Sequence, residues 1–391
     1  MKVEQLGLDI PGCQYVTHLN NAGAALMPRP ILDAATGYLR SEAFYGGYET
    51  NRQYEEELDE FYEAAATFIG AKAEEIAFME NATRAWASVF YALPFQPGDR
   101  ILTSRTEYAS NYMAYLQRAE KEDLSVELIP EDNDGVVSIS QLAGMMDERV
   151  RFVGISHMPT NSGQIQPVEK IGRLLGDYNN CWYLVDACQS VGQYPVDVEE
   201  IGCDFLSATG RKFLRGPRGT GFLYVNSEIL EEIEPPVVDV RSATWRKADR
   251  YDFQPGAKRF ELWEQNFAGK IGLTEAIKYA NAIGIRVIWE RIQELSDYFR
   301  NLVSDMDGIE LQDIGRDLSG IVSLTVRGKA PEQVRKELEK RNVNISTTGV
   351  TGTRLDMEQR GLDEVCRVSI HYYNTRDELD LCAEMLAKMV K

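Results

Sequence analysis

The chain has few residues that could hold a metal ion or a disulfide framework. Its 391 residues include six cysteines and three histidines. The cysteines are scattered and no two have the CxxC spacing, a pattern typical of reduced, mostly buried thiols in a chain of this size. The histidines, at positions 18, 157 and 371, lack ligand spacing. The sequence therefore predicts neither disulfides nor a metal site.

Positive charge is also scarce. Lysine and arginine number 42 against 61 acidic residues, which gives a formal net charge of -19. Nucleic acid and anionic membrane surfaces would repel such a chain, so neither is expected as a partner. No apolar run approaches the roughly 20 residues that span a bilayer. The first six residues lack a charged-then-apolar signal pattern, and a cytoplasmic location is expected.

What the chain has instead is an alternation of short apolar runs and amphipathic segments between about residues 70 and 225. With 44% hydrophobic and 26% charged residues, it reads as a globular protein of two or three domains. Helical patterns cover 84–93 and 167–177. Strands are expected at 75–78, 100–103, 125–129, 151–156, 182–186, 204–207 and 221–225. This alternation predicts an α/β fold with a largely parallel sheet, helices on both faces, and ligands beyond the carboxyl ends of the strands.

The pattern changes after residue 225. Residues 226–267 read as irregular, and a long helical stretch follows from about 268 to 306. Further strands are expected at 321–326 and 365–371, with helices at 331–341 and 375–391. We therefore predict a large domain over 26–267, a smaller α+β domain over 268–391, and an N-terminal segment, 1–25, that joins the small domain and the active site.

Lys212 is the most informative single residue because of its surroundings. Asp186 ends an apolar segment, and 26 residues later Lys212 follows Thr209 and Gly210 and precedes a glycine-rich stretch, 216–221. A strand-end carboxylate, then Ser/Thr and Gly beside a lysine, is what a pyridoxal-phosphate (PLP) enzyme requires. The lysine amine forms a Schiff base with the cofactor aldehyde, and the carboxylate keeps the pyridine nitrogen protonated. Alone, the lysine would be a solvated charge and the aspartate a helix cap.

These motifs also carry a family resemblance, which extends from His18–Gly23 to Cys366–Thr375. The segments Val185–Ser190, Pro195–Asp197 and Cys203–Phe205 are the most specific. The chain resembles class V aminotransferases of the fold-type I PLP enzymes, a family that includes cysteine desulfurases, isopenicillin-N epimerase-like proteins and C–S lyases. The resemblance implies a seven-stranded sheet in the large domain, an amino-acid substrate, and a homodimer with shared active sites.

The resemblance implies contacts to pyridoxal 5'-phosphate from several segments. Besides Lys212 and Asp186, Gln189 is expected at the cofactor's ring oxygen and Tyr108 at its ring face, where relatives carry histidine; an ordinary buried tyrosine is the alternative. Either Thr160, by position, or Asn161, by chemistry, is expected at the ring oxygen side. The phosphate is expected at a helix N-terminus and beside Lys212, with contacts from Asn81, Ala82, Thr83, Thr209 and Arg211.

Substrate contacts are implied in the same way. Arg367 matches the arginine that grips the substrate α-carboxylate with its planar fork, and Asn21, Ala22 and Gly23 are expected as a second contact. Trp263 is expected to shape the substrate pocket from across the dimer, in a loop whose relatives carry small residues. Arg354 is a candidate for a distal carboxylate, or else a solvent-facing salt-bridge residue.

The choice between possible reactions depends on whether one particular loop carries a cysteine. Cysteine desulfurases use a mobile cysteine on the loop before the C-terminal arginine, and the loop 344–354 has none. Several segments are similar to hercynylcysteine sulfoxide lyase-like members. We therefore expect a PLP-dependent C–S lyase that acts by β-elimination on a cysteine conjugate or sulfoxide. An aminotransferase is the alternative, and a non-catalytic PLP-binding protein is a third reading.

Overall fold

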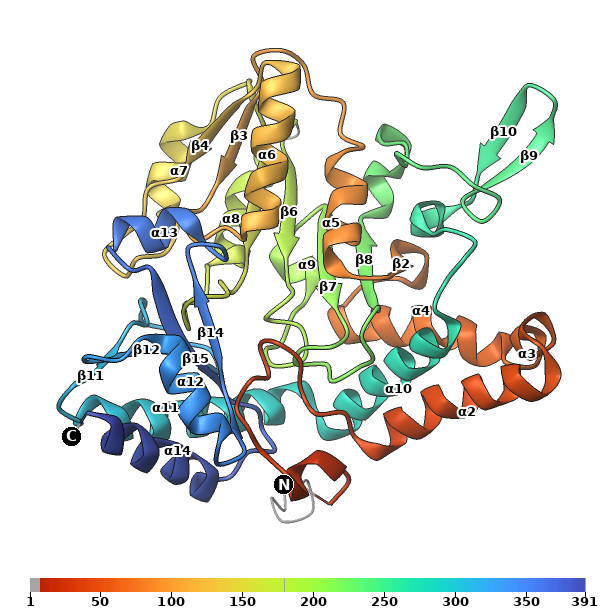
Figure 1. The fold of residues 1–391 in the computed structure, drawn as a ribbon. Coiled ribbons are helices and arrows are strands. Elements are labelled where there is room, and N and C mark those ends of the chain that lie inside the picture. The colour runs from red at the N-terminus through yellow and green to blue at the C-terminus, as the bar shows by residue number, and fades with distance from the viewer. Residues whose placement is uncertain (1–7, 179, 391) are drawn as a thin grey trace.

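A seven-stranded sheet forms the centre of the molecule in a computed structural model that describes residues 8–178 and 180–390 (Figure 1). β8 is antiparallel to both of its neighbours, β2 and β7, and the other neighbouring strands are parallel. The strand order is β2 (Ile76–Met79), β8 (Gly221–Val225), β7 (Phe205–Thr209), β6 (Trp182–Asp186), β5 (Val150–Ser156), β3 (Arg100–Thr103) and β4 (Ser125–Leu128).

Alternate residues of these strands pack into two separate cores. In β6, Trp182 and Leu184 belong to one core, whereas Tyr183 and Val185 belong to the other. This follows from the two-residue period of a strand, which sends successive side chains to opposite faces. A sheet buried on both faces needs nearly continuous apolar strands, which is why its strands could be found from their apolar runs.

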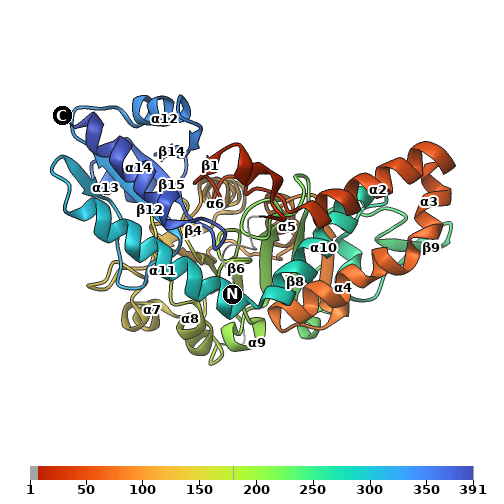
Figure 2. The same ribbon diagram turned by 90° about the horizontal axis from the view of Figure 1, so that it is seen from below.

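Helices cover both faces of this sheet, as the view from below shows (Figure 2). One face carries α5 (Ala82–Phe90) and α6 (Ala109–Glu122), and the opposite face carries α7 (Ile139–Met145), α8 (Val168–Leu175) and α9 (Val198–Ile201). Their connections place the loops after β3, β5, β6 and β7 at one edge of the sheet.

A second, antiparallel sheet is built from the C-terminal part of the chain. Its order is β11 (Ile309–Leu311), β12 (Ile321–Val326), β15 (Glu364–Ser369) and β14 (Ser346–Gly349). The helices α11 (Ile285–Ser304), α12 (Pro331–Glu339) and α14 (Arg376–Met389) pack their apolar faces on it. β1 (Thr17–His18) pairs with β13 (Val343–Asn344), so the N-terminal segment lies beside this sheet.

The remaining helices form a long arm on one side of the molecule, where α10 packs against α2 and α4 (Figure 2). Their bounds are α2 (Arg29–Tyr45), α3 (Gly47–Gln53), α4 (Glu55–Ile69) and α10 (Phe267–Ile283). The other elements are β9 (Ala243–Lys247), β10 (Arg250–Phe253), α13 (Arg354–Gln359) and the 3-10 turns η1 (Pro11–Gln14), η2 (Ala73–Glu75), η3 (Ser227–Glu232) and η4 (Gly256–Phe260).

The fold confirms the predicted α/β architecture, and each of the seven expected strands lies within two residues of its predicted bounds. The helical stretch expected over 268–306 is present as α10 and α11, which Gly284 separates because its backbone has a φ of 92°. One expectation was wrong: the region 226–267, expected to be irregular, contains the β9–β10 hairpin. The domain division stays a prediction. Among the described residues, no helix has the length and hydropathy that crossing a membrane requires.

Candidate active site

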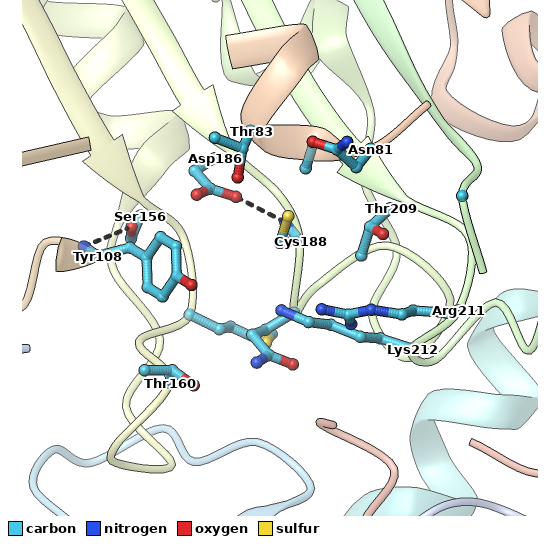
Figure 3. Close-up of a pocket in the computed structure, with 14 residues that line it drawn as sticks. Asn81, Thr83, Tyr108, Ser156, Thr160, Asp186, Cys188, Thr209, Arg211 and Lys212 are labelled. Atoms are coloured by element: carbon cyan, nitrogen blue, oxygen red, sulfur yellow. Dashed lines mark hydrogen bonds between the residues drawn. The ribbon is translucent and has the colours of Figure 1, made fainter. Parts of the chain in front are cut away.

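A pocket lies at the carboxyl edge of the large sheet, where loops from several strands meet (Figure 3). Parallel strands place their carboxyl ends at the same edge, so side chains far apart in the sequence converge there. The lining residues are Asn81, Ala82, Thr83, Tyr108, Ser156, Met158, Thr160, Asp186, Cys188, Gln189, Thr209, Arg211, Lys212 and Gly219. Most of the residues that the sequence predicted for a cofactor are therefore in one place.

Lys212 and Asp186 both line this pocket. Burial lowers the pKa of the Lys212 amine below its usual range, and the nearby Arg211 guanidinium lowers it further. Asp186 ends β6; its Oδ1 accepts the backbone N–H of Cys188 at 3.0 Å and its Oδ2 accepts from Asn111 Nδ2 at 3.0 Å. A carboxylate oxygen can accept more than one hydrogen bond, so Asp186 retains acceptor capacity toward the pocket.

Two guanidinium groups lie near one carboxylate at the pocket. Arg211 lines the pocket and Arg367 lies behind Thr160, whereas Asp186 is the carboxylate among the lining residues. Burial, and Arg211 beside it, lower the pKa of Arg367 to about 10. An anion carrying several charges would offset this excess. A phosphate group together with a substrate carboxylate has that character, so the residues present fit PLP.

The phosphate contacts predicted from the sequence lie at the N-terminus of α5. Asn81 is the N-cap, and its Oδ1 accepts the backbone N–H of Arg84 at 2.9 Å. Ala82 and Thr83 start the helix and face the pocket, where first-turn N–H groups have no partner within the helix. On the opposite side, Arg211 Nη1 donates to the carbonyl of Gly23 at 2.8 Å.

Thr160 and Asn161, which the sequence could not separate, lie in different surroundings. Thr160 lines the pocket. Asn161 is buried outside it, where its side chain donates to the carbonyl of Gly349 and accepts from Thr348 in β14. Gln189 also lines the pocket, and its Oε1 is buried without a hydrogen-bond partner. An unpaired buried amide oxygen is costly, and a polar ligand group would relieve that cost.

Arg367 comes from β15 of the second sheet and is not itself among the lining residues; it lies behind Thr160, which lines the pocket. Its Nη1 donates to Thr160 Oγ1 at 2.6 Å, and its Nε donates to Ser346 Oγ at 3.0 Å. These bonds hold the guanidinium plane in one orientation, as the fork-like binding of a carboxylate requires.

The segment Asn21–Gly23 is not among the lining residues, although the carbonyls of Ala22 and Gly23 accept hydrogen bonds from the lining residues Gln189 and Arg211. Its other polar groups are already engaged. Asn21 is buried and donates to the carbonyl of Ser369 at 2.7 Å, and the backbone N–H of Ala22 donates to Ser369 Oγ at 2.9 Å. The backbone N–H of Gly23 donates to Asn20. A substrate contact from these residues stays a prediction.

Trp263 and Arg354 are not among the pocket-lining residues. The Trp263 ring is half exposed and borders a separate groove, together with Leu39 and Tyr48. Arg354 starts α13, is exposed, and forms an ion pair with Glu358. The surroundings of Arg354 match the solvent-facing alternative that the sequence left open.

Several residues of the site escaped prediction. Glu107 and Asn111 form a buried network behind Asp186, while Ser156 and Cys188 line the pocket itself. Glu107 directly precedes the predicted residue Tyr108 and Asn111 lies three residues after it, while Cys188 lies two residues after Asp186. Their proximity in sequence to predicted residues is the only signal in the sequence that could have identified them as site residues.

Comparison with known proteins decides the family. The family model described as aminotransferase class-V matches residues 17–382. The chain belongs to the class V aminotransferase family. It is therefore a PLP-dependent enzyme, which confirms the cofactor and the enzyme class predicted from the sequence.

Several relatives of this class V enzyme carry the same description. A probable cysteine desulfurase of Methanothermobacter thermautotrophicus is 32% identical, over 100% of this chain and 98% of that protein. A probable cysteine desulfurase of Pyrococcus abyssi is 29% identical, with 99% and 98% covered. The apo structure of a cysteine desulfurase from Thermococcus onnurineus NA1 superposes with a TM-score of 0.92 at 27% identity, covering 99% of this chain and 98% of that one.

Proposed function

We propose that this class V enzyme is a C–S lyase that breaks the Cβ–S bond of its substrate by β-elimination. The substrate is a cysteine conjugate, which releases a thiol, or a cysteine sulfoxide, which releases a sulfenic acid. The observation that carries the proposal is that the segment 344–354 contains no cysteine. Residues 346–349 of this expected loop are strand β14, and Val350–Thr353, between β14 and α13, packs beside the pocket. The relatives described as cysteine desulfurases support a cysteine-type substrate. The absent nucleophile separates this chain from persulfide chemistry, which needs a mobile thiolate near the substrate.

The loop is held in place rather than free. The backbone N–H of Ala109, at the start of α6, donates to the carbonyl of Gly352 at 2.9 Å, and Gly352 N–H donates to Gly349 at 2.8 Å. A Cβ atom at position 352 would lie 2.6 Å from Asn161 Oδ1 and 3.0 Å from Thr160 Cγ2. Position 352 therefore has no room for a side chain in this arrangement.

The cysteines elsewhere are poor substitutes for a loop nucleophile. Cys366 is fully buried in β15, and burial raises the pKa of its thiol to about 12. Cys188 lines the pocket, but burial and the Asp186 carboxylate raise the pKa of its thiol well above the usual range. Neither thiol would carry the negative charge that nucleophilic attack on sulfur requires.

The proposed roles follow from the positions of the side chains. PLP, when bound, supplies an electron sink for negative charge at the substrate α-carbon. Lys212 would hold the cofactor and then remove the proton from that carbon, since burial lowers the pKa of its amine and so favours the neutral form that accepts a proton. Asp186 would accept a hydrogen bond from the pyridine nitrogen, and Arg367 would bind the α-carboxylate. Breaking the Cβ–S bond and adding water yields pyruvate, ammonia and the sulfur leaving group, which is a thiol from a conjugate and a sulfenic acid from a sulfoxide.

The test is a product assay on the purified protein reconstituted with PLP and supplied with S-substituted cysteines and their sulfoxides. A lyase forms pyruvate and ammonia in equal amounts and keeps its cofactor. A desulfurase given cysteine forms alanine instead, and an aminotransferase accumulates pyridoxamine phosphate without pyruvate; either result would overturn the proposal. Lys212→Ala should lower pyruvate formation at least a thousandfold, whereas Lys278→Ala, at an exposed lysine of α10, should not change it.

We also propose that the enzyme is a homodimer with shared active sites. Exposed apolar side chains gather on the arm, at Leu39, Phe44, Tyr45 and Tyr48, and the groove beside them includes Trp263. Exposed aromatic patches of this kind are typical of protein interfaces. This supports a partner subunit on the arm, with Trp263 near the border between the two subunits.

A further inference from the structure

A buried carboxyl group, Glu107, lies behind the pocket and takes no direct part in the roles described above. It precedes Tyr108 in the loop between β3 and α6, and its exposed fraction is 3%. Five neutral donors reach it. Oε1 accepts from Ser156 Oγ at 2.6 Å, Asn111 Nδ2 at 2.8 Å and Tyr108 N at 2.9 Å. Oε2 accepts from Thr103 Oγ1 at 3.0 Å and Ser156 N at 3.2 Å.

Asn111 connects this carboxyl group to Asp186. Its side-chain nitrogen donates to Glu107 Oε1 at 2.8 Å and to Asp186 Oδ2 at 3.0 Å, and its exposed fraction is 2%. An amide NH2 group has two hydrogens, so both bonds can form at once. One amide thus bridges two acidic side chains inside the protein.

The bridge has an electrostatic consequence. Burial raises the pKa of Glu107 to about 7, and the charge of Asp186 raises it as well. The coupling is reciprocal, because a negative charge on Glu107 makes Asp186 a better partner for a positively charged hydrogen-bond donor. The same Glu107 oxygen holds the backbone N–H of Tyr108, so one carboxyl group is tied to two predicted cofactor contacts.

We infer that Glu107 is a positioning residue that acts through Asn111 to orient the Asp186 carboxylate and to favour a protonated pyridine nitrogen on bound PLP. The inference rests on the proposed function, since it assumes that Asp186 meets that nitrogen. A purely structural Glu107 would stabilise the loop before α6 and have no effect on the cofactor.

The deciding measurement is the 15N chemical shift of PLP labelled at the ring nitrogen and bound to the protein, together with the dissociation constant for PLP. Asn111→Ala should weaken PLP binding about tenfold or more and move the 15N signal toward the unprotonated position. Glu107→Gln keeps the shape but removes the charge, so it should move the signal in the same direction. Glu120→Gln, the same change at an exposed residue of α6, should leave both quantities at wild-type values.

Melting temperatures of the variants without PLP separate positioning from folding. Wild-type 15N shift and PLP affinity in both Asn111→Ala and Glu107→Gln, with only a lower melting temperature, would overturn the inference. If Glu107→Gln does not fold, the variants Asn111→Ala and Asn111→Ser test the inference without it. Both remove the bridge to Asp186 and keep the hydrogen bonds of Glu107 to Thr103, Ser156 and Tyr108. Failure of wild-type protein to bind PLP would instead sink the proposed function. Asp186→Asn, which should lose the protonated signal, is the positive control.

Discussion

Charge balance in the pocket is decided at the scale of single residues. Lys212, Arg211 and Arg367 are near one another and near one wall carboxylate, Asp186. In water such like charges would be screened, but in a buried site each cation disfavours the protonation of the next. The arrangement lowers the pKa of the Lys212 amine and so favours its neutral form next to groups that attract anions, as capture of a phosphorylated aldehyde requires.

Lys212 should therefore react with PLP at pH values well below the ordinary lysine range. The unperturbed amine pKa is 10.5, and burial lowers it here. A neutral amine is the nucleophile, so the rate of capture should stay level as the pH falls below that value, where an ordinary lysine loses about tenfold per pH unit. Stopped-flow absorbance of the apoprotein mixed with PLP measures the rate. A tenfold fall per pH unit starting near 10.5 would contradict this.

Arg367→Lys should raise the KM for the amino-acid substrate about tenfold or more, with a smaller effect on kcat. An ammonium group cannot reproduce the planar fork that Thr160 and Ser346 orient. Steady-state kinetics of pyruvate formation give both constants. Arg376→Lys, at an exposed arginine paired with Glu294, is the matched control and should match the wild type. An unchanged KM in Arg367→Lys would rule out the carboxylate contact.

At the scale of elements, the loop Val350–Thr353 joins the two sheets at the pocket. It belongs to the segment between β14 and α13, yet it accepts a hydrogen bond from the first residue of α6, next to Tyr108. The close approach of Gly352 to Thr160 and Asn161 couples the loop to the pocket wall.

Gly352→Ala should lower both stability and activity. The added methyl group would lie 2.6 Å from Asn161 Oδ1, and overpacking of this kind costs about 1–3 kcal/mol. Gly144→Ala in α7 is the control, since a Cβ there meets nothing within 4 Å and should be neutral or stabilise the protein by up to about 1 kcal/mol. Urea unfolding and pyruvate assays measure the two effects. Equal stability of both variants would show that the loop can move aside without cost.

At the scale of the whole molecule, the arm of α2, α3, α4 and α10 extends from the large sheet, with α3 at its far end (Figure 2). α4 and α10 join the core of that sheet through Phe61, Ile69, Leu273 and Ile277. The outer residues of the arm include Leu39, Phe44, Tyr45 and Tyr48, which would be costly to leave in water as a contiguous patch. A second subunit is the proposed cover, and the groove beside Trp263 would then be buried in the assembly.

The molecular mass of the enzyme in solution should be about twice its chain mass of 44.2 kDa. Leu39→Glu places a charge in the proposed interface and should raise the dimer dissociation constant at least tenfold, with a parallel loss of activity because the active sites are shared. Leu381→Glu, at an exposed leucine of α14, should change neither. Analytical ultracentrifugation at several concentrations makes the measurement, and a monomeric wild-type protein would refute the proposal.

The sequence by itself determined the sheet, the family and the cofactor. Buried strands must be apolar on both faces, so their runs could be recognised without knowing what packs on them. Lys212 and Asp186 were recognisable because their roles depend on residue type and order along the chain. Roles of this kind can be predicted from short segments of sequence.

Only the tertiary structure decided which side chains meet. Thr160 and Asn161 are adjacent in sequence, and the path of the loop alone puts the first in the pocket and the second against β14. Glu107 accepts hydrogen bonds from residues of β3, β5 and α6. No single segment of the sequence could have predicted this set of contacts. Burial, charge coupling and hydrogen-bond geometry depend on distances between segments, and those distances exist only once the sheet has formed.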